Sequence, residues 1–186
     1  MQLVRLVSGG KEVRMSKRRG TFVTIDELID EVGVDAARYF FLERSPDTHM
    51  DFDLDLAKER SAKNPVYYIQ YAHARIVSIL RKAKSAKRKA RNINYKLLSE
   101  KEELELIKKL TQFPEIVEDT ARDYQVHRLP RYAHELAREF HNFYEKHRVI
   151  TADKKLTGAR LGLMAATRII LGNALALMGI RAPDKM

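Results

Sequence analysis

The spacing of apolar residues predicts helices over most of the chain. After Pro65, apolar residues recur every three or four positions, as on the buried face of a helix, at Ile69, Ala72, Ile76, Ile79, Leu80 and Ala83. A second stripe of this kind, from Pro130 to about Arg148, predicts that Ala133, Leu136, Phe140 and Phe143 face a core. A third segment, from about Lys155 to Met178, is rich in Ala, Leu and Ile. Residues 63–186 are therefore predicted to form a bundle of about four or five helices.

Local helix signals agree with this pattern. Asn64 followed by Pro65 is typical of a helix start, with Asn as the N-cap and Pro at the first helical position. Ser99 and Glu102 have the spacing of a capping box, which predicts a helix from there to about Thr111. Pro114 favours the start of a shorter helix, and Gly179 is predicted to end the last one.

The first 62 residues have a different pattern. Two short extended segments, Leu3–Val7 and Glu12–Met15, flank Gly9 and Gly10, and this arrangement predicts a β-hairpin. Small helices are predicted after it, and the stretch around Asp53 is predicted to cap the next helix. We expect a boundary near residue 62, between residues 1–62 and residues 63–186. The predicted fold class is mainly all-α, with a β-hairpin in front of a helix bundle.

Two further signals predict the helices before that boundary. Thr24 and Glu27 form a capping box at the start of the first helix. Gly33 is predicted to end that helix, and Asp35 to start another that reaches Leu42.

Composition excludes several classes of protein. The chain of 186 residues has no Cys, so disulfide scaffolds, thiolate metal sites and Cys nucleophiles are excluded. Its six His residues lack the spacing of metal ligands, and we expect no metal site. The most apolar run, Ile169–Ile180, is too short for a membrane span, and the first residues do not resemble a signal peptide. We therefore expect a cytoplasmic protein that does not associate with membranes.

The net charge of +10 is concentrated in one part of the chain. No Asp or Glu occurs between Arg60 and Ser99, whereas this stretch contains eleven cations: Arg60, Lys63, Arg75, Arg81, Lys82, Lys84, Lys87, Arg88, Lys89, Arg91 and Lys96. Such a field attracts polyanions, and the binding becomes salt-dependent because counterions are released. Charge alone leaves three alternatives open: a nucleic acid, a solvated helix face or an anionic membrane.

Several ordered motifs resemble one enzyme family. Arg14-Met15-Ser16-Lys17 resembles the KMSKS loop of class I aminoacyl-tRNA synthetases, with Arg14 at its first Lys and Arg18 at its final Ser. Gly33–Arg38 resembles the D-A-L-R motif that names an anticodon-binding domain, with Ala37 in place of Leu. Asn64–Arg75 and Leu177–Met186 are similar to two further segments of arginyl-tRNA synthetases. The chain is identified as the C-terminal portion of a member of that family.

The resemblance implies a function for each motif. In the whole enzyme, which attaches arginine to its tRNA, Lys17 would stabilise charge on ATP held with Mg, assisted by Arg14 and Ser16. The bundle would bind the anticodon loop of a tRNA for arginine through aromatic stacking, guanidinium contacts and phosphate contacts. The residues expected to do so are Tyr68, Tyr71, Arg75, Lys87, Arg88, Tyr144, Arg148 and Met186.

The HIGH motif of the family does not occur in this sequence. We therefore expect that the chain alone neither activates arginine nor holds ATP. We also expect it to be a monomer that binds tRNA. Its missing partner would be an N-terminal catalytic domain. Two other functions stay open: a freestanding RNA-binding or regulatory module derived from a synthetase, and a basic helical module that docks on another protein or an anionic membrane. The tyrosines could also have a purely structural role, for which Tyr67 is the first candidate.

Overall fold

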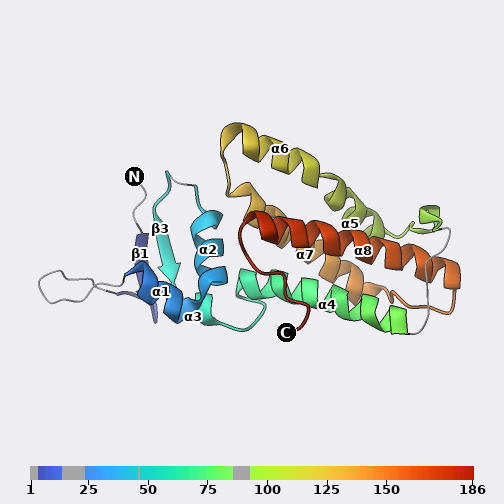
Figure 1. Cartoon of the computed structure of the whole chain (residues 1–186), viewed down its shortest axis with the longest axis horizontal. Helices are drawn as coiled ribbons and strands as arrows, with labels where there is room; N and C mark the ends of the chain where they lie inside the picture. Colours follow the sequence, from blue (N-terminus) through green and yellow to red (C-terminus); the bar gives the residue numbers. More distant parts are fainter. Residues whose placement is uncertain (1–3, 14–23, 46, 86–92) are drawn as a thin grey trace, which may run out of the picture.

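The protein consists of a small unit with a β-sheet and a longer bundle of helices (Figure 1). The computed structural model describes residues 4–13, 24–45, 47–85 and 93–186. In Figure 1 the strands and α1–α3 lie to the left, and α4–α8 run side by side to the right. The predicted fold class, a mainly helical bundle preceded by a small β element, is confirmed.

The sheet has three strands, β1 (Val4–Ser8), β2 (Lys11–Glu12) and β3 (Met50–Asp53), in the order β2-β1-β3. The β1–β2 pair is the predicted hairpin, and its turn glycines, Gly9 and Gly10, have φ values of 58° and 72°. Positive φ at both turn residues is what a two-residue hairpin loop of this twist requires. The pairing of β3 with β1 is parallel and was not predicted, because a short strand carries little local signal for its distant partner.

Three short helices complete the sheet unit: α1 (Ile25–Val32), α2 (Val34–Glu43) and α3 (Leu54–Lys58). The predicted capping box of α1 is present: Glu27 N donates to Thr24 Oγ1 at 3.2 Å, and Thr24 N donates to Glu27 Oε2 at 2.7 Å. Gly33, with a φ of 83°, separates α1 from α2, as predicted.

The turn into the bundle is built on two caps. Asp53 caps α3 by accepting from the backbone N–H groups of Asp55 and Leu56, each at 3.0 Å. Asn64 caps α4 by accepting from Val66 N at 3.0 Å, as predicted. The amide of Asn64 also donates to the carbonyl oxygens of Ala57 and Glu59, each at 3.0 Å. The cap of α4 therefore also fastens the end of α3.

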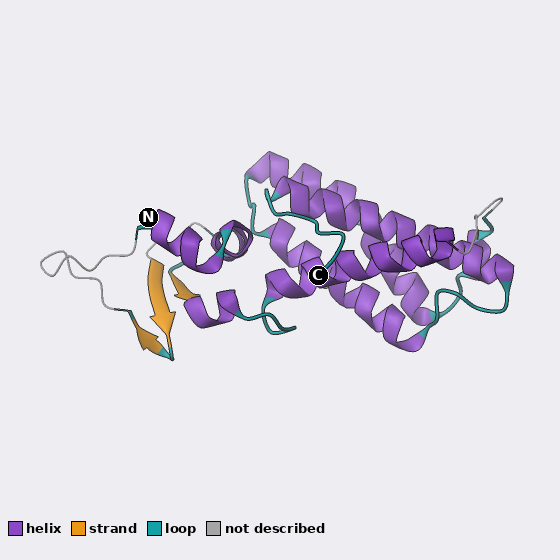
Figure 2. Cartoon of the chain, turned by 60° about the horizontal axis from the view of Figure 1, so that its bottom comes forward, coloured by secondary structure: helices purple, strands orange, loops and turns teal. Residues whose placement is uncertain are grey.

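In the part of the bundle that the structure describes there are six helical elements (Figure 2): α4 (Pro65–Ser85), the 3-10 helix η2 (Tyr95–Leu97), α5 (Lys101–Thr111), α6 (Phe113–Asp123), α7 (Arg128–Lys146) and α8 (Lys154–Leu177). Helix α7 packs against α4, α5, α6 and α8, and also against α2. Its predicted stripe, Ala133, Leu136, Phe140 and Phe143, is fully buried. In α4 the predicted stripe is buried as well, except that Leu80 is only half-buried. One hydrophobic core runs through the bundle and into the sheet unit.

Three predicted helix starts were wrong by one or two residues. Helix α2 begins at Val34, with Gly33 as its N-cap, so Asp35 lies inside the helix instead of starting it. Helix α5 is capped by Glu100 rather than Ser99, and Glu103 accepts from Glu100 N at 3.0 Å. The third residue of α5 is therefore Glu103, which is buried and accepts a hydrogen bond from Arg160. Helix α7 begins at Arg128 rather than Pro130, because Pro is tolerated throughout the first turn, where backbone N–H groups have no intrahelical partner.

Among the described residues, α8 is long and apolar enough, by length and composition, to cross a membrane. The most apolar run, Ile169–Ile180, is shorter than the helix, so this property of the whole helix was not predicted. In the structure the large side chains Met164, Leu171 and Leu175 of α8 are fully buried, and the helix packs against α4 and α7. Core helices of globular proteins meet the same criterion.

Charged contacts hold α5 to the end of α7 and to α8. The buried Arg160 donates from Nε to Glu103 Oε1 at 2.7 Å and from Nη1 to Arg148 O at 2.8 Å. At the surface, Glu102 accepts from His147 Nε2 at 3.0 Å and from Lys146 Nζ. These hydrogen bonds, from His147 first and Lys146 second, lower the pKa of Glu102 to about 2.

The buried ion pair predicts a large stability effect. Replacing Glu103 by Leu leaves the Arg160 guanidinium buried without its anion, which we expect to lower the free energy of unfolding by about 3–5 kcal/mol. The double variant E103L/R160M should lose less than E103L alone, since no unpaired charge remains. Urea denaturation measures both. Arg122→Met is the control, because its pairs with Glu118 and Asp119 are exposed and worth less than about 1 kcal/mol.

The contacts of Glu102 predict a pH dependence. The folded-state pKa of about 2 lies below the ordinary value of 4.5, so the stabilisation is complete above pH ~4.5 and disappears as the pH falls towards ~2. We expect Glu102→Gln to be less stable than the parent protein at pH 7 and equally stable near pH 2. Urea midpoints measured between these values check this. A gap as large at pH 2 as at pH 7 would contradict it, and Glu105→Gln, an exposed carboxylate on α5, serves as the control.

Candidate nucleic-acid interface

A stack of rings lies where α4 and α7 meet. The rings of Tyr67 and Tyr71 on α4 lie 6.3 Å apart with an angle of 8° between their planes. The ring of His141 on α7 lies 6.0 Å from that of Tyr71, at 14°. Tyr71 is 38% exposed and is therefore open to a further partner. Flat rings held in this way provide a surface on which another aromatic group can stack.

Tyr68 occupies a different position from its neighbours. Its half-buried ring packs against the core and lies 4.6 Å from His141 and 5.2 Å from His134. Burial raises the pKa of the Tyr68 hydroxyl. Tyr67 was the first candidate for a structural role, whereas in the structure Tyr68 is the tyrosine that packs against the core. A contact between Tyr68 and tRNA stays a prediction.

Arg75 and Tyr144 form a cation–π pair between α4 and α7. The guanidinium carbon of Arg75 lies 4.9 Å from the centre of the Tyr144 ring, and that ring stacks at 5.8 Å on the buried Phe140. The core ring therefore supports Tyr144, and Tyr144 in turn orients the exposed Arg75. Arg148 lies just beyond the end of α7 and lines the same hollow as Arg75 and Tyr144.

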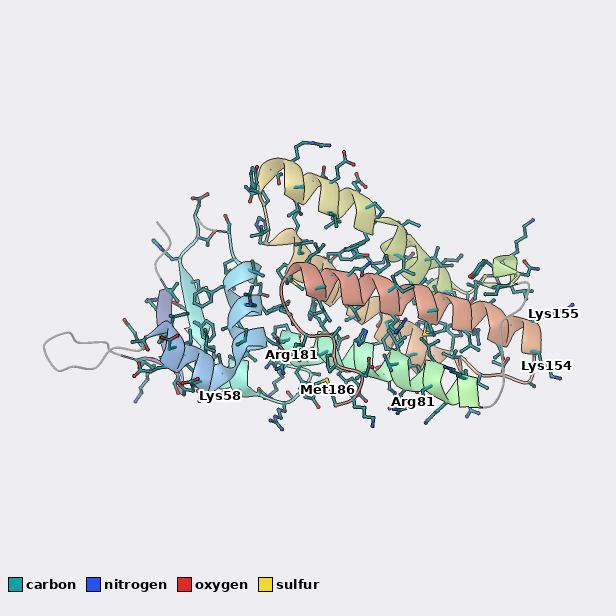
Figure 3. All side chains as sticks on the ribbon, in the orientation of Figure 1. Lys58, Arg81, Lys154, Lys155, Arg181 and Met186 are labelled. Carbon is teal, nitrogen blue, oxygen red and sulfur yellow. The ribbon has the colours of Figure 1, made fainter. Side chains whose placement is uncertain are left out.

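The last residues of the chain reach this surface as well. After α8 the chain turns back across α4 (Figure 1), and Figure 3 places Met186 and Arg81 along α4. Met186 lines a hollow together with Tyr71 and Arg75, and this hollow shares Arg75 and Ser78 with the one that contains Tyr144 and Arg148. We call this continuous surface the tyrosine–arginine groove; its defining residues are Tyr71, Arg75, Tyr144, Arg148 and Met186.

The groove carries more positive than negative charge. Five cations line its two hollows, against the two carboxylates of Asp184 and Glu145: Arg75, Arg81, Lys82, Arg148 and Lys185. This excess favours the approach of a phosphate backbone. The side chains combine the two features that single-stranded RNA loops need, cations for phosphates and exposed rings for bases.

The ring contact between His141 and Tyr71 was not predicted, because the spacing of the histidines was compared only with that of metal ligands. Burial lowers the pKa of both His141 and His134, so their rings are neutral at pH 7. A neutral His141 ring can stack with Tyr71 without adding charge. Its position three residues before Tyr144 on the predicted helix was the available signal, because such residues share a face.

Five of the predicted site residues lie outside the described residues: Arg14, Ser16, Lys17, Lys87 and Arg88. Their assigned contacts with ATP or phosphate stay predictions. The other six are described, and all of them lie on α4, at or just beyond the end of α7, or in the last residues of the chain.

Comparison with known proteins identifies the family of the chain. The model of the "DALR anticodon binding domain" family matches residues 69–186, so Gly33–Arg38 lies outside the matched range. The chain is 55% identical over its whole length to the arginine–tRNA ligase of Desulforamulus reducens and 53% identical to that of Symbiobacterium thermophilum. It spans about a third of the length of these curated relatives, covering 34% of each.

Solved structures agree in fold. A Campylobacter jejuni protein assigned as an arginyl-tRNA synthetase superposes on the whole chain with a TM-score of 0.84 and 30% identity, and 40% of that protein is covered. The Thermus thermophilus arginyl-tRNA synthetase superposes with a TM-score of 0.71 and 29% identity, over 91% of this chain and 29% of that one. Since the family model covers more than half of the sequence, the chain belongs to the family of DALR anticodon-binding domains.

Proposed function

We propose that this chain is the tRNA-binding, C-terminal part of an arginine–tRNA ligase. In this proposal the tyrosine–arginine groove holds the anticodon loop of a tRNA for arginine. The observation that carries it is the gathering of Tyr71, Arg75, Tyr144 and Met186 on one positively charged face. The names of the relatives support the choice of arginine as the amino acid.

The groove suits unpaired nucleotides better than duplex RNA. A base that leaves the anticodon stack can stack on Tyr71, whose ring is held in place by Tyr67 and His141. Arg75, already oriented by Tyr144, can donate hydrogen bonds to a base edge or a phosphate without first being ordered. Lys82 and Arg148 are placed to meet the phosphates that follow.

In the whole protein, the reaction would be the ATP-dependent attachment of arginine to tRNA. Lys17, with Arg14 and Ser16, is the group that we assign to ATP and its Mg, on sequence grounds. The parallel pair of β1 and β3 supports the idea that the sheet unit continues a larger parallel sheet, because parallel strands seldom occur in small isolated sheets. We further propose a cytoplasmic monomer that does not associate with membranes, with α8 acting as a core helix.

Loss of an exposed ring should weaken the binding of RNA. We expect Tyr71→Ala to raise the Kd for the tRNA of arginine about tenfold, since stacking of one base on an aromatic ring is worth about 1–3 kcal/mol. Tyr71→Phe should keep most of the affinity because the ring remains. A filter-binding titration measures all three proteins.

The control for this titration is Tyr124→Ala. Tyr124 is 80% exposed and caps the end of α6, and Figure 1 shows α6 and α4 on opposite sides of the bundle. The discrimination between the tRNA of arginine and the same tRNA with an altered anticodon should fall in Y71A and persist in Y124A. Lys82→Ala should weaken both RNAs equally and reduce the salt dependence. If Y71A and Y124A bind alike, the groove is not the anticodon site.

The chain alone should not activate arginine. The loop at Lys17 supplies only part of the contacts that the transition state of adenylate formation needs, and the HIGH motif does not occur in this sequence. We expect no arginine-dependent exchange of pyrophosphate into ATP from residues 1–186, under conditions in which a full-length relative is active. Exchange at the rate of the relative would refute the proposed division of roles.

A further inference from the structure

The segment after α8 begins with a defined turn. Gly179, with a φ of 67°, donates from N to Ala176 O, and Ile180 N donates to Leu175 O, each at 2.9 Å. This pair of backbone hydrogen bonds ends the helix and reverses the direction of the chain. Ile180 is then buried, whereas residues 184–186 are exposed. We call residues 179–186 the return segment.

Asp35 on α2 holds the return segment through its carboxylate. Oδ1 accepts from Arg181 N at 3.2 Å, and Oδ2 accepts from Arg181 Nε at 3.0 Å and from Gln70 Nε2 at 2.9 Å. Gln70 Nε2, on α4, also donates to Arg181 O at 2.9 Å. The carboxylate therefore joins three parts of the molecule: α2, α4 and the return segment.

Two neighbouring contacts keep the return segment on the same course. An atom added at the Cβ position of Gly179 would lie 2.8 Å from Arg38 Nη1, so the segment passes directly beside α2. Further along, the ring of His73 on α4 is hydrogen-bonded through Nδ1 to Pro183 O at 2.9 Å. Beyond Pro183 the segment reaches Met186, which lines the tyrosine–arginine groove.

We propose that Asp35 is a positioning residue for RNA recognition: by fixing Arg181, it sets where Met186 and Lys185 stand in the groove. The proposal rests on the proposed function of the groove. It also makes the groove depend on α2, which belongs to the sheet unit rather than to the bundle. Asp35 is buried and lines neither of the two hollows that make up the groove, so we expect its effect on RNA to pass through the return segment.

The carboxylate of Asp35 acts mainly as a hydrogen-bond acceptor rather than as half of a surface ion pair. The side chain of Arg181 is 84% exposed and that of Asp35 only 12% exposed, so the guanidinium adds little by itself. The backbone N–H of Arg181 and the amide of Gln70 are the donors that fix the main chain of the segment. In Asp35→Asn an amide NH₂ replaces one oxygen and meets at least one of these donors, so the network cannot be complete.

The test compares Asp35→Asn with Asp30→Asn. Asp30 is an exposed carboxylate on α1, so the second variant makes the same charge change away from the return segment. The chain is labelled with ¹³C at the methionine methyl groups, and the Met186 signal is assigned by its loss in M186L. We expect D35N to broaden this signal and to move its chemical shift towards that of a solvent-exposed, unrestrained methionine. D30N should leave the signal unchanged. Gln70→Ala, which removes the same link from the α4 side, should reproduce the D35N effect and replaces D35N if that variant does not fold.

RNA binding then separates positioning from stability. D35N should raise the Kd for the tRNA of arginine about tenfold, because it displaces both Met186 and the cation of Lys185 from the groove. A chain shortened by Lys185 and Met186 should lose as much affinity for this tRNA. Adding D35N to the shortened chain should not raise the Kd further, because both changes act on the same contact.

Three outcomes are decisive. An unshifted Met186 signal in both D35N and Q70A would overturn the role of Asp35, as would fully additive losses in the shortened chain. A shifted signal in a chain that binds no tRNA in its parent form would refute the proposed function while leaving the anchoring of the return segment intact.

Discussion

The packing of α7 between α4, α5 and α8 is the constraint on which the candidate site depends. The inward stripe of α7 is fully buried, and so are Ile69, Ala72 and Ile76 of α4. Burial on one face sets the rotation of each helix about its own axis, and with it the direction of every flanking side chain. His141 and Tyr144 of α7 are thereby turned towards Tyr71 and Arg75 of α4. The groove is a consequence of how the core is filled, which explains why its rings are already stacked before any ligand is present.

The sequence predicted those parts of the fold that are encoded locally. The hairpin, the capping box of Thr24, the Asn64-Pro65 start of α4 and the buried stripes of α4 and α7 all rest on residues a few positions apart. The start of α5 was wrong by one residue because Ser99 and Glu100 can both serve as the cap, and the start of α7 by two because Pro130 fits anywhere in the first turn. The parallel pairing of β3 with β1 joins residues 46 positions apart, as between Arg5 and Asp51, and no local pattern encodes it.

The candidate site was predicted only in part, for the same reason. Periodicity placed Tyr68, Tyr71 and Arg75 on one side of a helix, but not against Tyr144, which lies about seventy residues later in the sequence. The motif resemblance supplied that link. What neither source supplied is the division of labour between adjacent tyrosines: Tyr68 joins the core, while Tyr67 stacks on Tyr71. A helix turns by about 100° per residue, so a rotation of a few tens of degrees, decided by packing, exchanges such roles.

The buried charges of the bundle have a geometric consequence as well. Arg160 is satisfied by Glu103 and by the carbonyl oxygen of Arg148, so one guanidinium ties α8 to α5 and to the turn that follows α7. Glu102 fixes the same turn from the outside through His147. The backbone of Arg148 is thus held from two directions, while its side chain stays exposed in the groove. A cation on an immobile backbone loses less entropy when it meets a phosphate than one on a mobile loop. The ordered rings of α4 and the fixed turn after α7 therefore contribute to recognition in the same way: both are already ordered in the free chain, so less conformational entropy is lost when RNA binds.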